Sequence, residues 1–413
     1  MNLKNEDSVA SFYAGKSIFI TSATGFIGKV FLEKILYSCV DIDRVYVLVR
    51  EKNDKSDIYL FQMFFRIKNE RPDALSKVVP VNGDICHENL GIGTDDEEFI
   101  DKVKIIVVFH VAASIKFNER IDLSLQSNVE GTRKVLKLCR RMRHLQAFVH
   151  LSTAYTNTDE KILEEKVYPP AAKLHEVHKF IEEHGVEDEK QIEMILNGRP
   201  NTYTFTKALA ENLIVDEKLD VPAIIIRPSI VSPAYKEPME GWVDTWMGAS
   251  GLIVSTAKGM NRVIFAKKDN VLDLIPVDFV VNFMIVAAAR CDRRQQLAVY
   301  NCCSSGSNPI TIQDILYYMK DFCTKTGFSK LILPRHYVLH RYTKMQSQVI
   351  SNRQLLKFFT ARSWIMKSDG VRSVYQSLDP QDQQTFPCDP GLINWHQYIP
   401  VYLRGIKRYL LKM

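Results

Sequence analysis

Short, nearly continuous apolar runs separated by helical patterns dominate the first 230 residues of the chain. Six runs of this kind are apparent: 17–21, 44–49, 78–81, 104–109, 147–151 and 223–226. Strands with apolar side chains on both faces are typical of a parallel sheet covered by helices on both sides. The alternation therefore predicts an α/β fold built on a doubly wound parallel sheet of the Rossmann type.

The alternation stops near residue 230. Residues 228–260 are rich in Pro, Gly, Trp and Met, and we interpret them as a lid on the substrate side. Beyond it, the pattern predicts a buried helix over 278–290, a short strand over 298–301 and mainly helices from Thr311 to a final amphipathic helix. We therefore expect a Rossmann domain with its lid over 1–305 and a smaller helical C-terminal domain over 306–413.

Composition narrows the class of protein. With 46% hydrophobic and 25% charged residues, the chain can bury a sizeable core. Its eight cysteines form no CxxC pair, so we expect free thiols in a reducing compartment and no metal site. The N-terminus does not resemble a signal peptide, and the apolar run 279–289 is too short to span a bilayer. These features predict an intracellular protein that is soluble or peripheral.

Positive charge is concentrated in one region. Residues 325–372 carry ten Lys and Arg residues, with Asp369 as the only acid. This excess favours an acidic partner, such as an anionic membrane surface or a polyphosphate ligand, although a solvated basic face without a partner is an equal alternative. We expect no nucleic-acid partner.

A small-residue loop lies between the first strand and the first long helix. A dinucleotide pyrophosphate can approach the backbone there at the positive end of a helix. The loop supplies the first candidate cofactor residues: Thr21, Ser22, Thr24, Gly25, Phe26, Ile27 and Gly28. Ser22 stands where glycine usually permits a tight turn, so we expect a lower cofactor affinity or an adjusted loop.

Further cofactor candidates follow the next three strands. Arg50 can bind a 2′-phosphate and so favours NADPH, although it can also be a surface residue that ends a strand. Asp84 follows the third strand, where a carboxylate can meet the adenine amino group. Ala112 and Ala113 follow the fourth strand, where small residues let the nicotinamide pass closely.

The motif Tyr203-Thr-Phe-Thr-Lys207 carries the candidate chemistry. Residues four apart on a helix share one face, so we expect the ammonium to lower the phenol pKa and Tyr203 to protonate a carbonyl oxygen as hydride reaches the carbon. Ser152 or Thr153, at the end of a strand, can hydrogen-bond the developing oxyanion. The alternative is an ordinary pair of helix residues.

Three other residues lie near the predicted site: His110, Trp242 and Trp246. His110 ends a strand, and we expect a packed, hydrogen-bonded histidine without a chemical role. Trp242 and Trp246 can line an acyl tunnel or form the core of the lid, and the sequence favours neither alternative.

Several longer stretches resemble the fatty acyl-CoA reductase family of extended short-chain dehydrogenases, particularly its insect members. The resemblance covers nearly the whole chain, and its most specific parts are 110–117 (HVAASIKF), 150–157 (HLSTAYTN), 200–211 (PNTYTFTKALAE), 227–233 (RPSIVSP) and 274–278 (LIPVD).

The resemblance implies a two-step reduction of a fatty acyl-CoA. A first NADPH delivers hydride to the thioester, the thiohemiacetal collapses with loss of CoA, and a second NADPH reduces the aldehyde to the fatty alcohol. Lys207 would also hold the nicotinamide ribose, and Arg227, Pro228 and Ser229 would join the cofactor site. Association with the endoplasmic reticulum or peroxisomal membrane, on the cytosolic face, is implied as well.

The chain also departs from the family pattern. Asn118 stands where the family usually has Asp, and the region between Pro309 and Asp369 is short and lacks a long hydrophobic segment. We therefore expect peripheral attachment through the basic region 325–372 or the last helix. Two alternatives stay open: a non-catalytic acyl-CoA or lipid-binding relative, and a dehydrogenase acting on a nucleotide sugar or steroid.

Overall fold

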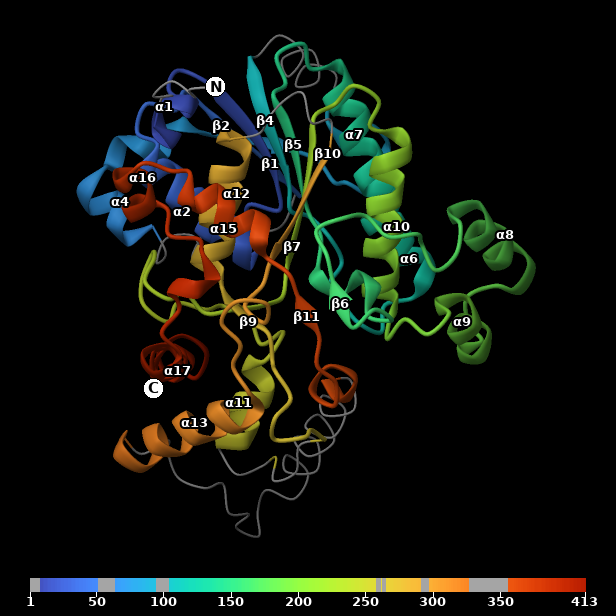
Figure 1. Cartoon of the computed structure of the whole chain (residues 1–413). Helices are drawn as coiled ribbons and strands as arrows, with labels where there is room; N and C mark the ends of the chain where they lie inside the picture. The colour runs from blue at the N-terminus through green and yellow to red at the C-terminus, as the bar shows by residue number, and fades with distance from the viewer. Residues whose placement is uncertain are drawn as a thin grey trace, which may run out of the picture.

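The computed structural model describes residues 8–50, 64–93, 104–257, 261, 265–290, 297–326 and 356–413. In this part of the chain, seven parallel strands form one sheet with the order β10-β7-β5-β4-β1-β2-β3 (Figure 1). The strands are β1 (Ser17–Thr21), β2 (Val45–Val49), β3 (Val78–Asn82), β4 (Ile105–His110), β5 (Ala147–Leu151), β7 (Ala223–Pro228) and β10 (Leu297–Cys302). Six of them coincide with the predicted apolar runs and β10 with the predicted short strand 298–301, each to within two residues, which confirms the doubly wound parallel sheet.

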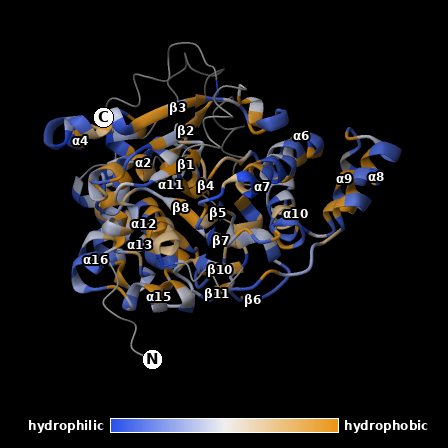
Figure 2. Cartoon of the chain, turned by 90° about the horizontal axis from the view of Figure 1, so that it is seen from above, coloured by the Kyte–Doolittle hydropathy of each residue, from blue (hydrophilic) through white to orange (hydrophobic). Residues whose placement is uncertain are grey.

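Helices cover both faces of the sheet (Figure 1). One face carries α1 (Val9–Tyr13), α2 (Phe26–Ser38), α4 (Phe65–Glu70), α12 (Val277–Ala289), α15 (Asp369–Gln376) and α16 (Pro380–Thr385). The other carries α6 (Ile121–Leu125), α7 (Gly131–Arg141) and α10 (Thr202–Glu217). Beyond α10, a pair of helices projects from the body: α8 (Leu174–His184) and α9 (Glu189–Leu196). Hydrophobic residues are concentrated along the strands, and the outer helices are largely hydrophilic (Figure 2).

A smaller layer lies beyond the carboxyl ends of the strands, at the bottom of Figure 1. It contains α11 (Ser250–Ala257), α13 (Ile312–Thr326), α17 (Trp395–Gly405) and the parallel pair β8 (Ile230–Ser232) and β9 (Leu274–Pro276). A second short pair joins β6 (Ile162–Leu163) to β11 (Ile365–Met366). The sequence pattern did not reveal either pair, since both consist of two- or three-residue strands contributed by distant segments.

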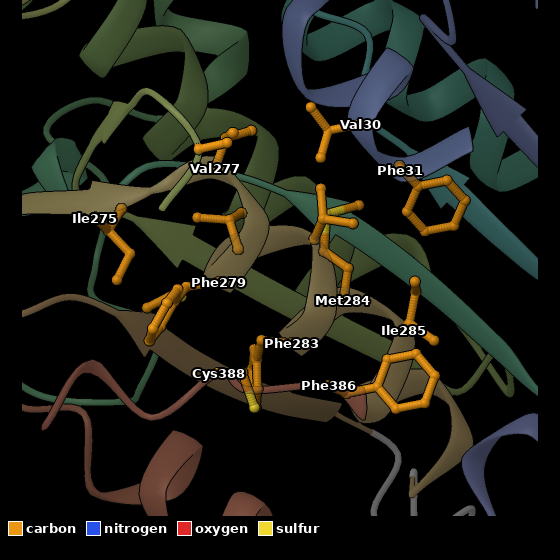
Figure 3. Packing of buried hydrophobic residues seen from close by; sticks show 14 of the residues in the cluster. Val30, Phe31, Ile275, Val277, Phe279, Phe283, Met284, Ile285, Phe386 and Cys388 are labelled. Carbon is orange, nitrogen blue, oxygen red and sulfur yellow. The ribbon is translucent and has the colours of Figure 1, made fainter. Parts of the chain in front are cut away.

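The helical C-terminal part shares its core with the sheet. Side chains of α12 lie between those of α2 and the C-terminal segment: Val277, Phe279, Phe283, Met284 and Ile285 face Val30 and Phe31 on one side and Phe386 and Cys388 on the other (Figure 3). The expected helices after residue 305 are present, and they extend one continuous core. The division at 305/306 stays a prediction.

The final helix, α17, is buried by the lid. The hydroxyl of Tyr398 lies 2.6 Å from the carbonyl oxygen of Pro233, and that of Tyr402 lies 3.1 Å from Oγ of Ser250. A Cβ on Gly405 would lie 1.8 Å from the carbonyl oxygen of Gly241, so the two backbones are in direct contact. The protein itself thus covers the apolar face of this helix.

No helix within the described ranges combines the length and the apolar character needed to cross a membrane. The predicted basic region 325–372 falls mainly on residues 327–355, which lie outside the described residues.

Candidate active site

The candidate site lies where the strand order reverses, between β1 and β4. Ligands of doubly wound sheets bind at this point, beyond the carboxyl ends of the strands. A cavity of about 270 Å³ opens there. Most of the predicted site residues line it: Ser22, Gly25, Phe26, Ile27, Gly28, Ala113, Ser152, Thr153, Tyr203, Lys207, Pro228 and Ser229.

The loop before α2 forms one wall of the cavity. Ser22 has φ +63°, the left-handed region that favours glycine, so the loop keeps the turn of the usual motif with a strained serine in it. A Cβ on Gly28 would lie 2.0 Å from the carbonyl oxygen of Ser22, which explains why this position has no side chain. Gly25 caps α2 without a side-chain hydrogen bond, so the first amides of the helix remain available to an anion. These features fit a dinucleotide pyrophosphate.

Two predicted cofactor residues meet at the edge of this loop. Arg50 follows β2, Asp84 lies two residues after β3, and Nη1 of Arg50 is 4.0 Å from Oδ2 of Asp84. The Arg50 side chain is 64% exposed, which leaves its charge accessible. Their proximity follows from the pairing of β2 with β3.

Four other predicted cofactor residues, Thr21, Thr24, Ala112 and Arg227, are not among the residues that line the cavity. Thr24 is exposed. Thr21 holds the backbone together at this edge of the sheet. Its Oγ1 accepts hydrogen bonds at 3.0 Å from the amides of Val111 and Ala112. These bonds tie the end of β1 to the chain that follows β4.

Tyr203 and its helix partner Lys207 have environments that the motif alone did not reveal. Burial raises the pKa of Tyr203 to about 12, although its hydrogen bond with the Thr153 side chain opposes the rise. Burial lowers the pKa of Lys207 to about 7, and nearby Glu211 opposes that change. Nζ of Lys207 donates to the carbonyl oxygen of Leu151 at 2.7 Å. The expectation that Lys207 lowers the pKa of Tyr203 is therefore wrong for this structure, because desolvation of the phenol dominates.

Ser152 and Arg227 belong to a buried charge network. Oγ of Ser152 donates to Oε1 of Glu211 at 2.5 Å, and Arg227 binds the same carboxylate through Nε at 2.9 Å and Nη2 at 2.5 Å. Thr153, not Ser152, is therefore the hydroxyl that meets Tyr203. The Arg227 side chain faces Glu211 and is not among the residues that line the cavity, so its expected place in the cofactor site stays a prediction. Sequence reasoning missed Glu211, although its position one turn after Lys207 was a signal.

The histidine and tryptophan predictions are settled by geometry. The ring nitrogens of His110 contact Oγ1 of Thr21 at 3.1 Å and Oγ1 of Thr132 at 3.0 Å, and burial lowers its pKa to about 3. A packed neutral histidine is thus confirmed. Trp242 is buried and stacks on Phe26, and neither Trp242 nor Trp246 lines the cavity, so the structure places Trp242 in the core of the lid.

The other half of the cavity is apolar and comes from segments far apart in the sequence. The lid, the loop after β4 and the short helix 356–360 all contribute, and the sequence did not identify their lining residues: Ile115, Phe117, Tyr155, Ile230, Val231, Met247, Leu252, Leu272, Leu356 and Phe359. The ring centroids of Phe117 and Phe359 lie 5.5 Å apart, so side chains from distant parts of the sequence meet in this apolar wall.

Comparisons with known proteins agree with this arrangement. Two family models described as male sterility protein match the chain, an NAD-binding model over residues 20–284 and a second, named Sterile, over 315–413. Fatty acyl-CoA reductase 1 from Xenopus laevis is 34% identical, and the human protein of that name is 32% identical. Fatty acyl-CoA reductase 2 from Bos taurus is also 32% identical. Each match covers 98% of this chain and 86% of the relative.

Solved structures share the fold at lower identity. The terminal R domain from the myxalamid biosynthetic pathway aligns with a TM-score of 0.65 and 20% identity, covering 95% of this chain and 90% of that one. A nonribosomal peptide synthetase reductase domain from Mycobacterium tuberculosis aligns with a TM-score of 0.62 and 15% identity. The alignment covers 99% of this chain and 96% of that one. UDP-glucuronic acid 4-epimerase from Bacillus cereus aligns with a TM-score of 0.57 and 15% identity. The alignment covers 95% of this chain and 96% of that one. The solved structures show the shared fold, and the near full-length relatives at 32–34% identity show that the chain belongs to the fatty acyl-CoA reductase family.

Proposed function

We propose that this protein reduces a long-chain fatty acyl-CoA to a fatty alcohol with NADPH, releasing CoA and passing through an aldehyde. The observation that carries the proposal is the position of Tyr203 and Thr153, which lie in one cavity between the glycine loop and an apolar wall. Membership of the family, shown by relatives named fatty acyl-CoA reductase, supports the substrate class.

Tyr203 is suited to protonate the substrate oxygen. Because its pKa is about 12, the phenol keeps its proton at neutral pH and can donate it to a carbonyl oxygen on which negative charge develops. The Thr153 side chain, hydrogen-bonded to Tyr203, holds the phenol in position. A bound nicotinamide would supply the hydride. The apolar wall excludes water from the reacting carbon and offers room for an acyl chain.

The preference for NADPH rests on Arg50. Its exposed guanidinium at the end of β2 is available to a 2′-phosphate, and its neighbour Asp84 can meet the adenine or its ribose. The chain's own residues thus support the phosphorylated cofactor.

Peripheral attachment to the endoplasmic reticulum or peroxisomal membrane is a further part of the proposal. Burial of the apolar face of α17 argues against the last helix as the attachment site. The basic region 325–372 is then the better candidate.

Turnover by the purified protein tests the proposal. NADPH consumption would be followed with acyl-CoAs of increasing length, with products identified by mass, for the wild type and Tyr203→Phe. We expect the wild type to form alcohol and the variant to lose about 10²–10⁴-fold in rate. A wild type that binds acyl-CoA without turnover would instead support a non-catalytic binding protein, the alternative that the strained Ser22 favours.

A further inference from the structure

A second cavity, of about 720 Å³, lies beside the active site. It is lined by α9 and the residues just before it, the loop after β4, the residues that lead into α10 and the short helix 356–360. Its lining includes Asn118, Ile192, Leu196, Arg199, Thr202 and Phe358. In Figure 1, α9 stands away from the sheet next to the start of α10.

An aromatic partition separates this cavity from the active site. Phe117 lines both cavities, and its ring centroid lies 6.1 Å from that of Tyr203. Phe358 lines the second cavity, and Phe359 lines the first. The two cavities therefore share the Phe117 side chain as a common wall next to Tyr203.

The second cavity contains a buried cation, Arg199, with one unused donor. The Arg199 side chain is 5% exposed, and its Nη1 pairs with Asp159. Its Nε is buried and has no hydrogen-bond partner among the described residues. A buried donor without an acceptor is unfavourable, so an acceptor supplied by a ligand would stabilise Arg199 here.

The charges of the lining exclude a strongly anionic ligand. The second cation, Arg120, is paired with Asp122 and Glu187. The lining also carries the carboxylates of Glu119, Glu187 and Glu193. A phosphate would meet net negative charge in this cavity, whereas a neutral chain with amide groups would find donors, acceptors and apolar side chains together.

We propose that the second cavity binds the neutral pantetheine arm of a CoA thioester, with the Arg199 guanidinium donating to an amide oxygen of that arm. The assignment rests on the proposed function, since it requires a CoA thioester at Tyr203. The acyl chain then occupies the apolar half of the first cavity, and the phosphates of CoA lie outside both cavities.

The test compares substrates that contain and lack the arm. Acyl-CoA, S-acyl-pantetheine, an S-acyl N-acetylcysteamine thioester and the fatty aldehyde would be reduced by the wild type and by Arg199→Met. We expect the variant to lose about tenfold in kcat/KM for acyl-CoA and for S-acyl-pantetheine, as for loss of a hydrogen bond from a charged group. Activity on the aldehyde, which has no arm, should not change. The N-acetylcysteamine thioester keeps the amide nearer the sulfur, so a loss with it would identify that amide as the acceptor, and no loss would identify the amide farther from the sulfur.

Two further variants separate binding from folding. Ile192→Trp, on the half-buried face of α9, would fill the cavity without changing charge and should reproduce the pattern of Arg199→Met. Arg140→Met, on the exposed face of α7, is the matched control and should leave every substrate unaffected.

Each contrary result overturns the assignment in a different way. Equal losses on acyl-CoA and aldehyde would show that Arg199 acts only on the fold. A loss with acyl-CoA but not with S-acyl-pantetheine would assign the cavity to the phosphates. Unchanged kinetics in both cavity variants would leave no role for the cavity in substrate binding. A wild type inactive on thioesters and aldehyde alike would refute the proposed function itself.

Discussion

Arg227 and Glu211 bury opposite charges behind the active site, with side chains 2% and 1% exposed. The pair joins β7 to α10, and Ser152 hydrogen-bonds to the same carboxylate at the end of β5. The relevant perturbations are Arg227→Met, Glu211→Gln and the two combined. Each single change leaves one buried group without its partner, whereas the double change removes both charges.

The burial of both side chains sets the expected loss of unfolding free energy. Removing one member of a buried ion pair destabilises a protein by about 3–5 kcal/mol, because the remaining charge stays buried without compensation. In the double variant, the loss should fall short of the sum of the single losses by on the order of 1–3 kcal/mol. Urea unfolding followed by tryptophan fluorescence would measure these free energies. Calorimetry would measure NADPH binding to Arg227→Met, which we expect to be unchanged once the variant is folded.

Two results would refute this reasoning. Additive losses in the double variant would show that the two residues do not stabilise each other. A variant Arg227→Met that keeps its stability and loses NADPH affinity would return Arg227 to the cofactor site, where the sequence resemblance placed it.

Three further predictions concern the cofactor and the lysine. Gly28→Ala places a Cβ 2.0 Å from the carbonyl oxygen of Ser22, so NADPH affinity should fall about tenfold or more in calorimetry, whereas Gly93→Ala, with open space around it, should have no effect. Arg50→Ala should raise the KM for NADPH about tenfold and leave that for NADH unchanged, and equal changes for both cofactors would contradict its role at the 2′-phosphate. Because burial lowers the pKa of Lys207 from 10.5 to about 7, the unfolded chain holds more protons on this residue between these values. The unfolding free energy of the wild type relative to Lys207→Met should therefore rise between pH 7 and 10.5, and a constant difference would contradict the burial argument.

The sequence by itself determined the sheet and the cofactor loop. Apolar runs such as 17–21 and 147–151 match β1 and β5 residue for residue, because a strand buried on both faces needs an unbroken apolar segment. The loop from Ser22 to Gly28 could be identified because its turn depends on a few adjacent residues, and the departure at Ser22 could be recognised as a residue in a glycine position.

Tertiary structure decided the electrostatics of the site. The Tyr203–Lys207 spacing placed both residues on one helix face, yet the pKa of each is set by how deeply the side chain is buried. Burial depends on every segment packed around α10. The partner of Arg227 could not be read from its motif either, since Glu211 reaches it from another element.

Tertiary structure also decided the shape of the substrate site. The ring centroids of Phe117 and Phe359 lie 5.5 Å apart, although the two residues are separated by more than half of the chain. The second cavity likewise depends on where α9 lies relative to the start of α10. Local patterns record which residues are apolar and which turns are tight, because those preferences act between neighbours in the chain. Cavity walls and buried ion pairs arise from contacts between distant segments, and only the folded chain brings these segments together.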